Sequence, residues 1–165
     1  MITLEGVRII ARLAHAGQVD KIGAPYVNHV YAVEDGLKHL SLEIRMTGLL
    51  HDVLEDADLT MDDLSELGIP DYVIHLVEVV TKRSDETYLH MLERICEVPA
   101  ALMVKIADNA HNSRPDRLAK VDEKTRERLE RKYRAARDIM YPCVADRRDI
   151  EEILASVNPS LISEL

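Results

Sequence analysis

Phenylalanine and tryptophan are absent from this 165-residue sequence, and its aromatic side chains apart from histidine are six tyrosines. A core without these two large side chains must be built from Leu, Ile, Val, Met and Ala, which suits helices that pack on helices. No apolar run is long enough to cross a bilayer, and the N-terminus lacks the pattern of a secretory signal. The length fits one domain. We therefore expect an all-α, cytoplasmic protein with no membrane partner.

Cysteine is scarce, and basic residues are outnumbered by acidic ones. Cys96 and Cys143 show no metal-type spacing, so we interpret them as reduced thiols in a cytosolic protein. The 30 acidic and 21 basic residues give a net charge of -9, which argues against a general nucleic-acid binder. A small anionic substrate stays compatible with this charge, provided that a metal ion and a few local cations offset the repulsion.

Apolar residues recur at helical spacing along most of the chain. Helices are predicted over residues 3–16, 28–40, 41–52, 60–68, 70–82, 85–97, 100–112, 123–140 and 148–156, with a loop at 18–26 and a tail from 158. Ser41 and Ser84 are predicted N-caps, Thr60 opens a capping box, and Pro99 is predicted to begin the helix over 100–112. The β-branched segment 70–82 also fits a strand, but nothing nearby supplies a partner strand. The alternating charges of 123–137 indicate a solvated helix face. These features predict one helical-bundle domain over 1–165.

The segment Gly48-Leu49-Leu50-His51-Asp52-Val53-Leu54-Glu55-Asp56 ends an apolar helix with a histidine and three carboxylates. On a continuous helix His51 and Glu55 share a face, with Asp52 beside them. Burying such groups costs several kcal/mol each unless a partner compensates, and a divalent metal is the usual partner. A helix C-terminus with a capping histidine and solvated acids is the simpler alternative.

Two further positions favour the metal. His29 lies at a predicted loop-to-helix junction, and Asp108 interrupts an apolar helix. With His51 and Asp52 they form a mixed nitrogen and oxygen donor set, which suits Mn, Fe or Zn better than Ca. Singly, each residue is more often a cap or a satisfied core residue; as an ordered set they predict a metal site that activates a water molecule.

This order resembles the His…His-Asp…Asp pattern of the HD superfamily of metal-dependent phosphohydrolases. The resemblance extends to the alarmone hydrolases, the RelA/SpoT-like enzymes that remove the 3′-pyrophosphate from (p)ppGpp. It covers roughly residues 5–115, leaving the helices of 116–165 outside it. It is carried by Ala14-His15-Ala16-Gly17-Gln18, Lys21, Gly23-Ala24-Pro25-Tyr26-Val27-Asn28-His29, Leu49-Leu50-His51-Asp52-Val53-Leu54-Glu55-Asp56 and Val104-Lys105-Ile106-Ala107-Asp108-Asn109-Ala110-His111-Asn112.

The resemblance implies an HD-type helical bundle and a set of roles. The metal ligands would be His29, His51, Asp52 and Asp108, with Mn²⁺ preferred and other divalent transition metals as alternatives. Glu55 and Asp56 would be the catalytic pair that orients or deprotonates the attacking water. Lys21 would meet phosphate, and Asn112 would meet the nucleotide. His15 and His111 are expected to pack near the site. The implied reaction releases pyrophosphate from a guanosine nucleotide and requires no synthetase domain.

Some positions depart from the family pattern. Asp20 stands where the family has a basic residue before Lys21, and Val30 replaces a common proline after His29. The acid at position 20 should weaken binding of a highly phosphorylated substrate, and Arg114 is a candidate replacement cation. Two alternatives therefore stay open: an HD phosphatase or phosphodiesterase on another nucleotide, and a catalytically silent, nucleotide-binding regulatory module. The sequence leaves both a monomer and a homo-oligomer open.

Overall fold

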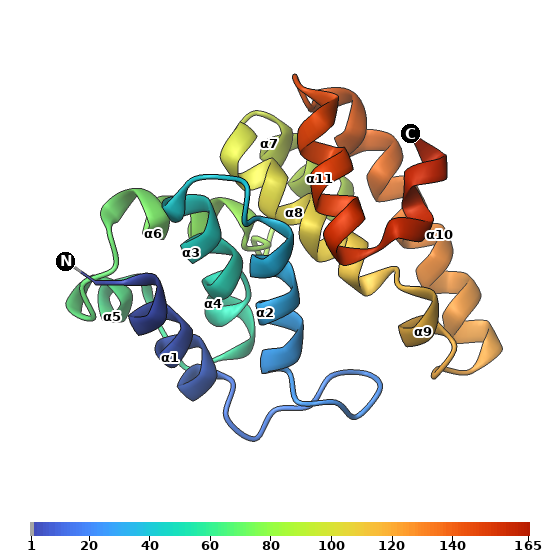
Figure 1. Cartoon of the computed structure of the whole chain (residues 1–165). Helices are drawn as coiled ribbons and strands as arrows, with labels where there is room; N and C mark the ends of the chain where they lie inside the picture. Colours follow the sequence, from blue (N-terminus) through green and yellow to red (C-terminus); the bar gives the residue numbers. More distant parts are fainter. Residues whose placement is uncertain (1) are drawn as a thin grey trace.

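Helices make up the regular secondary structure of the protein, which a computed structural model describes over residues 2–165. Within these residues there is no β-strand beyond an isolated bridge between Val19 and Pro25, so the all-α prediction is confirmed. The elements, shown in Figure 1, are α1 (Leu4–Ala14), α2 (Val27–Gly36), α3 (Leu42–Leu50), α4 (Val53–Asp56), α5 (Met61–Glu66), α6 (Asp71–Val80), α7 (Tyr88–Cys96), α8 (Pro99–Asn112), α9 (Pro115–Leu118), α10 (Glu123–Met140), η1 (Tyr141–Cys143), α11 (Arg147–Val157) and η2 (Pro159–Glu164).

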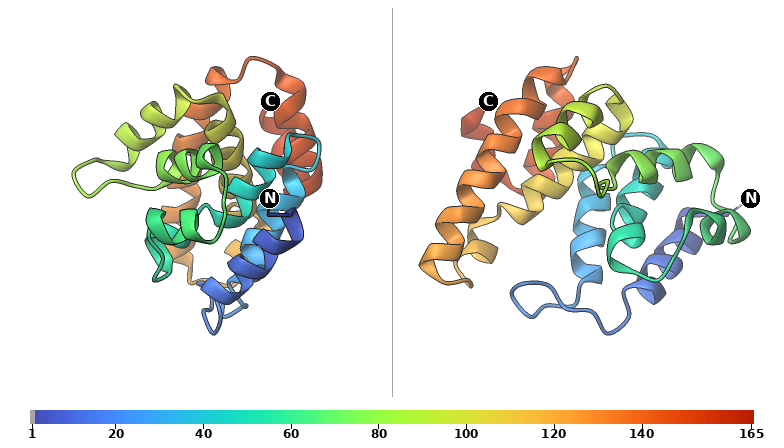
Figure 2. Two further views of the ribbon diagram at one scale, coloured as in Figure 1. Left: turned by 90° about the vertical axis from the view of Figure 1, so that its left-hand side faces the viewer. Right: turned by 180° about the vertical axis from the view of Figure 1, so that it is seen from behind.

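The helices pack around two clusters of buried aliphatic side chains. One cluster joins α1, α3, α5 and α6, and the other joins part of α6 with α7, α8, α10 and α11. Figures 1 and 2 show how these helices are arranged. Helix α2 contributes to both clusters, because Val30 packs with the first group while Val33 and Leu37 pack with the second. Helix α2 and the almost fully buried α8 therefore occupy the middle of the molecule.

Small residues let α2 approach its neighbours closely. A Cβ atom added at Gly36 would lie 2.4 Å from Val157 Cγ2 of α11. A Cβ at Gly48 of α3 would lie 2.7 Å from Leu37 Cδ1. The same region buries the carboxylate of Glu34, which pairs with Arg8 of α1 and Arg45 of α3. These contacts fix α2 against the helices that carry the other candidate site residues.

Most predicted helix boundaries agree with the structure. Thr60 forms the expected capping box with Asp63, and Pro99 begins α8. The segment 71–80 is helical, so the choice of helix over strand there is confirmed. Ser41 stands at the predicted N-cap position but makes no capping side-chain hydrogen bond.

Three local predictions were wrong, and one short helix was missed. The helix predicted from 85 begins at Tyr88, because the Thr87 side chain, rather than Ser84, accepts the capping hydrogen bond from the His90 amide. Helix α2 ends at Gly36 instead of residue 40. The short helix α9 was not predicted. The expected tail is the 3-10 helix η2, which buries Leu161 against α11 and α8.

The predicted solvated face of α10 is only one side of that helix. Its other side buries Leu129, Tyr133 and Met140. The buried Arg137 donates to Glu164 Oε2 at 2.8 Å and to Ser113 Oγ at 3.0 Å, which ties α10 to η2 and to the end of α8.

Both cysteines are free thiols. Among residues 2–165, none of the helices combines the length and the apolar character needed to span a membrane.

Candidate metal centre

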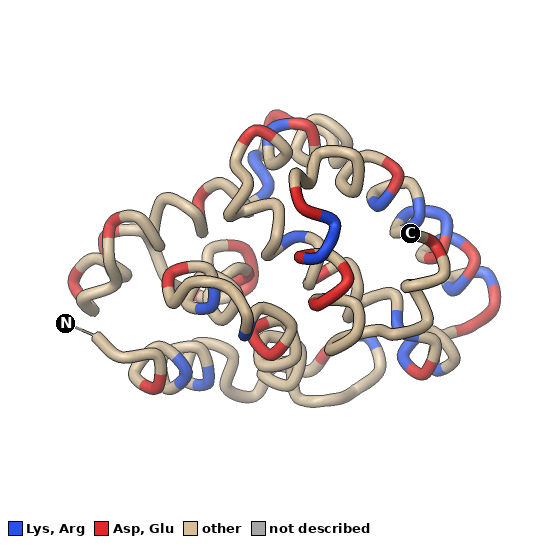
Figure 3. Tube along the Cα trace, turned by 45° about the horizontal axis from the view of Figure 1, so that its top comes forward, with Lys and Arg blue, Asp and Glu red and all other residues tan. Residues whose placement is uncertain are grey.

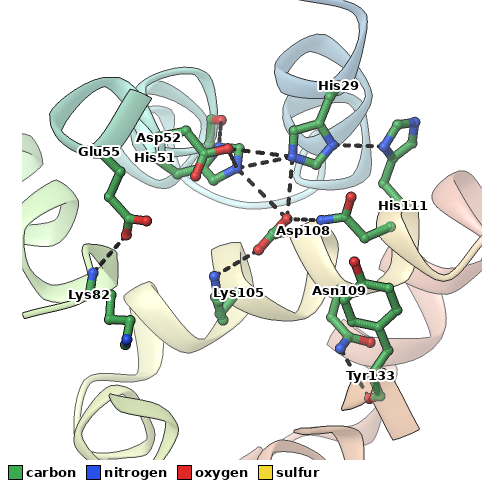
Figure 4. A network of polar contacts seen from close by, with 12 residues as sticks. His29, His51, Asp52, Glu55, Lys82, Lys105, Asp108, Asn109, His111 and Tyr133 are labelled. Carbon is green, nitrogen blue, oxygen red and sulfur yellow. Dashed lines mark hydrogen bonds and ion pairs between the residues drawn. The ribbon is translucent and has the colours of Figure 1, made fainter. Parts of the chain in front are cut away.

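The four predicted metal ligands come from three regions of the chain that meet in the middle of the molecule (Figure 4). His29 lies in the first turn of α2, and Asp108 lies in the buried part of α8. His51 caps the C-terminus of α3, and Asp52 precedes α4. The backbone leaves regular α geometry at Asp52, where φ is -108° and ψ is 0°. This break separates α3 from α4.

The donor atoms of these residues converge on a small volume. One donor atom each from His29, His51 and Asp108 lies within 4.8 Å of the others. His29 Nε2 is 3.2 Å from His51 Nε2 and 3.3 Å from Asp108 Oδ1. Asp52 Oδ2 lies 2.8 Å from His51 Nε2 and 3.6 Å from His29 Nε2. The structure thus brings together two imidazole nitrogens and two carboxylates.

The outer nitrogen of each histidine ring has a hydrogen-bond partner that orients the inner one. His51 Nδ1 lies 2.7 Å from the Gly48 carbonyl oxygen, which only accepts, so this nitrogen carries the proton. His29 Nδ1 lies 2.8 Å from His111 Nδ1. Burial, together with the nearby His29, lowers the pKa of His111 to about 3, so this ring is neutral and can accept. Both Nε2 atoms can therefore present a lone pair to the centre of the cluster.

Each aspartate also has an oriented partner. Asp52 Oδ2 accepts a hydrogen bond from Tyr26 Oη at 2.6 Å. Asp108 Oδ1 accepts from Asn112 Nδ2 at 2.6 Å, and its Oδ2 accepts from Lys105 Nζ at 2.8 Å. Asp108 and Asn112 stand four positions apart on α8, so they share one face of this helix. The hydrogen bonds hold the carboxylates in fixed directions, as the outer partners of metal ligands do.

Charge in the cluster favours a cation at its centre. Burial disfavours the charged form of His51, but the carboxylates of Asp52 and Asp108 overcome this effect and raise its pKa to about 9. Burial likewise opposes ionisation of Asp108, yet Lys105 and the histidines hold the pKa of its carboxyl well below the usual range. A buried site that draws in a proton this strongly also suits a divalent metal ion, and its nitrogen and oxygen donors fit one.

The two predicted catalytic acids follow the cluster in sequence, but within residues 2–165 they are not bonded to its ligands. Glu55 Oε1 accepts a hydrogen bond from the Lys82 amide at 2.7 Å (Figure 4). The backbone oxygen of Asp56 accepts from Gln18 Nε2 at 2.6 Å. Both acids are exposed. Over residues 2–165 neither carboxylate forms a hydrogen bond or ion pair with the predicted ligands. The expected shared face of His51 and Glu55 is lost because the helix breaks at Asp52.

The predicted substrate contacts lie on the α10 side of the cluster. Lys21 Nζ lies 3.5 Å from Tyr133 Oη, and a small cavity of about 20 Å³ is lined by Lys21, Asn112, Tyr133 and residues of α9. The structure thus places Lys21 and Asn112 along one cavity. A larger cavity of about 430 Å³ between α10 and η2 contains none of the predicted ligands.

Asp20, the departure from the family pattern, has a structural explanation. Its Oδ1 accepts hydrogen bonds from the amides of Ile22 and Ala24, both at 3.0 Å. Its Oδ2 pairs with Arg117 Nη1 at 2.7 Å. Burial opposes ionisation, but the hydrogen bond from Arg117 lowers the pKa of Asp20. The Asp20 carboxylate, which the sequence suggested would repel the substrate, is therefore paired with Arg117 and with two amides of its own loop. The proposed replacement cation, Arg114, pairs with Asp116.

Sequence reasoning missed three side chains near the cluster. Lys105 stands three positions before Asp108 on one helix, and this spacing could have revealed the pair. Tyr26 lies inside a motif used for the family resemblance, but nothing in the sequence links it to Asp52, 26 residues away. Arg117 meets Asp20 across 97 residues, a pairing that has no local signal.

No protein-family model matches the chain. Among curated proteins it is 36% identical over 135 residues to the probable GTP pyrophosphokinase of Mycobacterium leprae, covering 73% of this chain and 17% of that protein. It is 32% identical over 138 residues to the bifunctional (p)ppGpp synthase/hydrolase SpoT of Escherichia coli, covering 72% of this chain and 20% of that protein. The chain thus spans about a fifth or less of the length of these relatives.

The fold also matches a solved structure described as "A metazoan ortholog of SpoT hydrolyzes ppGpp and plays a role in starvation responses". The TM-score is 0.71 at 24% identity, and the match covers 92% of this chain and 93% of the other. Fold, motif order and sequence identity agree, and the chain belongs to the RelA/SpoT-like family of HD-domain proteins.

Proposed function

We propose that this chain is a Mn²⁺-dependent, cytoplasmic (p)ppGpp 3′-pyrophosphohydrolase, and that residues 1–165 form one HD domain. The observation that carries the proposal is the buried convergence of two imidazole nitrogens and two carboxylates, each with an oriented outer partner. Two names among the similar proteins support hydrolysis of ppGpp: the synthase/hydrolase SpoT and the metazoan SpoT ortholog.

In this proposal His29, His51, Asp52 and Asp108 hold the metal ion. A divalent cation bound there lowers the pKa of a water molecule and offsets the negative charge of the phosphate groups. Tyr26, Lys105 and Asn112 keep the two aspartates in place, because each donates a hydrogen bond to a carboxylate oxygen. Mixed nitrogen and oxygen donors suit Mn²⁺ together with other transition metals.

Glu55 and Asp56 accept the proton of the attacking water. The Lys82 amide fixes one oxygen of Glu55, which leaves the other oxygen for the water. Gln18 Nε2 donates a hydrogen bond to the backbone oxygen of Asp56. Both carboxylates are exposed, so they act on a water at the surface of the site rather than as metal ligands. Lys21 and Asn112, which line one cavity, bind the phosphate and the sugar of the nucleotide.

The proposal is tested by pyrophosphate release from ppGpp, with metal-stripped protein assayed with and without Mn²⁺. Asp52→Ala should abolish the release, and His75→Ala, which changes an exposed histidine of α6, should leave it unchanged. Mn²⁺-dependent release from other nucleotides but not from ppGpp would replace the alarmone assignment with a different phosphohydrolase. No turnover of any phosphoester would refute an enzymatic role and support the regulatory module.

A further inference from the structure

Three lysine side chains from three separate elements lie at Asp108 or at Tyr133. Lys105 Nζ of α8 lies 2.8 Å from Asp108 Oδ2. Lys21 Nζ, from the loop before α2, lies 3.5 Å from Tyr133 Oη. Lys132 Nζ of α10 lies 4.4 Å from the ring centroid of Tyr88 and 6.0 Å from that of Tyr133. Such a gathering stands out in a chain of net charge -9. Along α10 itself, acidic and basic residues alternate (Figure 3).

Two of these three ammonium groups lack a neutralising carboxylate. Lys105 is paired with Asp108, but within residues 2–165 neither Lys21 nor Lys132 forms an ion pair. Burial, together with the charges of Lys21 and Lys105, lowers the pKa of Lys132. An anion bound between Lys21 and Lys132, which both contact Tyr133, would relieve the repulsion between their like charges.

Asp20 does not supply the missing negative charge, although it precedes Lys21 in the chain. Its two oxygens are engaged by Arg117 and by the amides of Ile22 and Ala24. The Asp20 charge is thus paired with Arg117 and the loop amides, and it does not neutralise Lys21.

Two tyrosine rings contact the exposed Lys132 side chain before any ligand binds. An ammonium group is attracted to the face of an aromatic ring. Tyr88 begins α7, and Tyr133 is buried in α10, so the rings that hold Lys132 belong to packed helices. A side chain held in this way loses less conformational freedom when it binds an anion.

We propose that Lys132, held against Tyr88 and Tyr133, is a further phosphate-binding residue that acts together with Lys21. This inference rests on the proposed function and deepens it: the site takes a nucleotide that carries several phosphate groups, in preference to a phosphomonoester. Lys132 binds phosphate oxygens and takes no part in the proton transfer, so it affects substrate affinity rather than the chemical step.

The test compares Lys132→Gln with Lys124→Gln, a matched change at an exposed lysine near the start of the same helix. Because one charge-assisted hydrogen bond is lost, we expect Lys132→Gln to raise KM for ppGpp about tenfold while kcat stays within about twofold. Lys132→Arg should restore most of the affinity, and the tenfold difference should shrink as salt is raised. Lys124→Gln should leave KM unchanged.

A purely structural role for Lys132 would give a different pattern. Its loss would then lower the melting temperature and kcat without a specific, salt-dependent effect on KM, and that result would overturn the inference. A KM for Lys132→Gln within twofold of the unaltered protein would overturn it as well.

A second measurement separates this inference from the proposed activity. Calorimetric titration with inorganic pyrophosphate measures anion binding whether or not ppGpp is hydrolysed. The inference predicts about tenfold weaker binding to Lys132→Gln than to Lys124→Gln. Equal binding by the two variants, or no binding of pyrophosphate by the unaltered protein, would refute it.

Discussion

Replacing Tyr26 with phenylalanine tests whether the contacts around the cluster serve a metal ion. Tyr26→Phe removes one hydroxyl group, which donates to Asp52 Oδ2 at 2.6 Å. The ring itself stays packed, with its centroid 5.0 Å from that of His15 and 5.5 Å from that of His29. The variant should therefore fold normally and lose only the orientation of one predicted ligand.

The expected size of the effect follows from two independent figures. A hydrogen bond to a charged group contributes about 1.5–3 kcal/mol. Loss of an outer partner of a metal ligand costs about 10–100-fold in metal affinity. Since about 1.4 kcal/mol corresponds to a factor of ten, the two figures agree. We expect the Kd for Mn²⁺ to rise between about tenfold and a hundredfold in Tyr26→Phe.

Competition with a metal-binding dye measures this Kd directly. Tyr31→Phe is the matched control, because its hydroxyl donates to the Arg8 carbonyl oxygen at 3.4 Å and touches none of the predicted ligands. Both variants lose one tyrosine hydroxyl, so a general effect of the substitution appears in both. A Kd for Tyr26→Phe within about twofold of the unaltered protein would refute the assignment of Asp52 as an oriented ligand.

Two further predictions concern the scaffold. Gly36→Ala should lower the melting temperature in scanning calorimetry, because the new Cβ would lie 2.4 Å from Val157 Cγ2. Such overpacking costs about 1–3 kcal/mol. An unchanged melting temperature would contradict this packing. Hydrogen bonds from Arg94 hold the pKa of Glu86 at about 2, below its ordinary value of 4.5. The pair therefore stabilises the fold above pH 4.5, and this stabilisation is lost as the pH falls toward 2. Urea unfolding should show Glu86→Gln less stable than the unaltered protein at pH 6, with the difference much smaller at about pH 3; an equal difference at both values would contradict the pairing.

The parts of the fold that the sequence predicted are those with local signals. Thr60 and Pro99 mark helix starts through chemistry within one turn, and both predictions are confirmed. Ser84 and Thr87 carry the same capping chemistry three residues apart, so the local sequence does not distinguish them, and in the structure Thr87 is the cap. Helix α7 begins at Tyr88, which lets Arg94 bind Glu86 and the carbonyls of the preceding segment.

The candidate site shows the same division between local and distant information. The motif order identified which residues meet, since His29, His51, Asp52 and Asp108 do converge. It could not show that the helix breaks at Asp52, whose side chain contacts Tyr26 and His29 from a distant part of the sequence. Nor could it show that Asp20 is neutralised by Arg117, which lies 97 residues away and reaches it only through the fold. The expectation that Asp20 weakens substrate binding arose because the sequence does not reveal Arg117 as its partner.

The most direct test of the account is the rate of pyrophosphate release from ppGpp as Mn²⁺ is titrated into metal-stripped protein. If the two histidines and two aspartates hold one ion that drives the reaction, the rate should rise from near zero and level off at about one Mn²⁺ per chain. His51→Ala should show no such rise. A rate that is already full without metal, or no release at any Mn²⁺ concentration, would contradict the account.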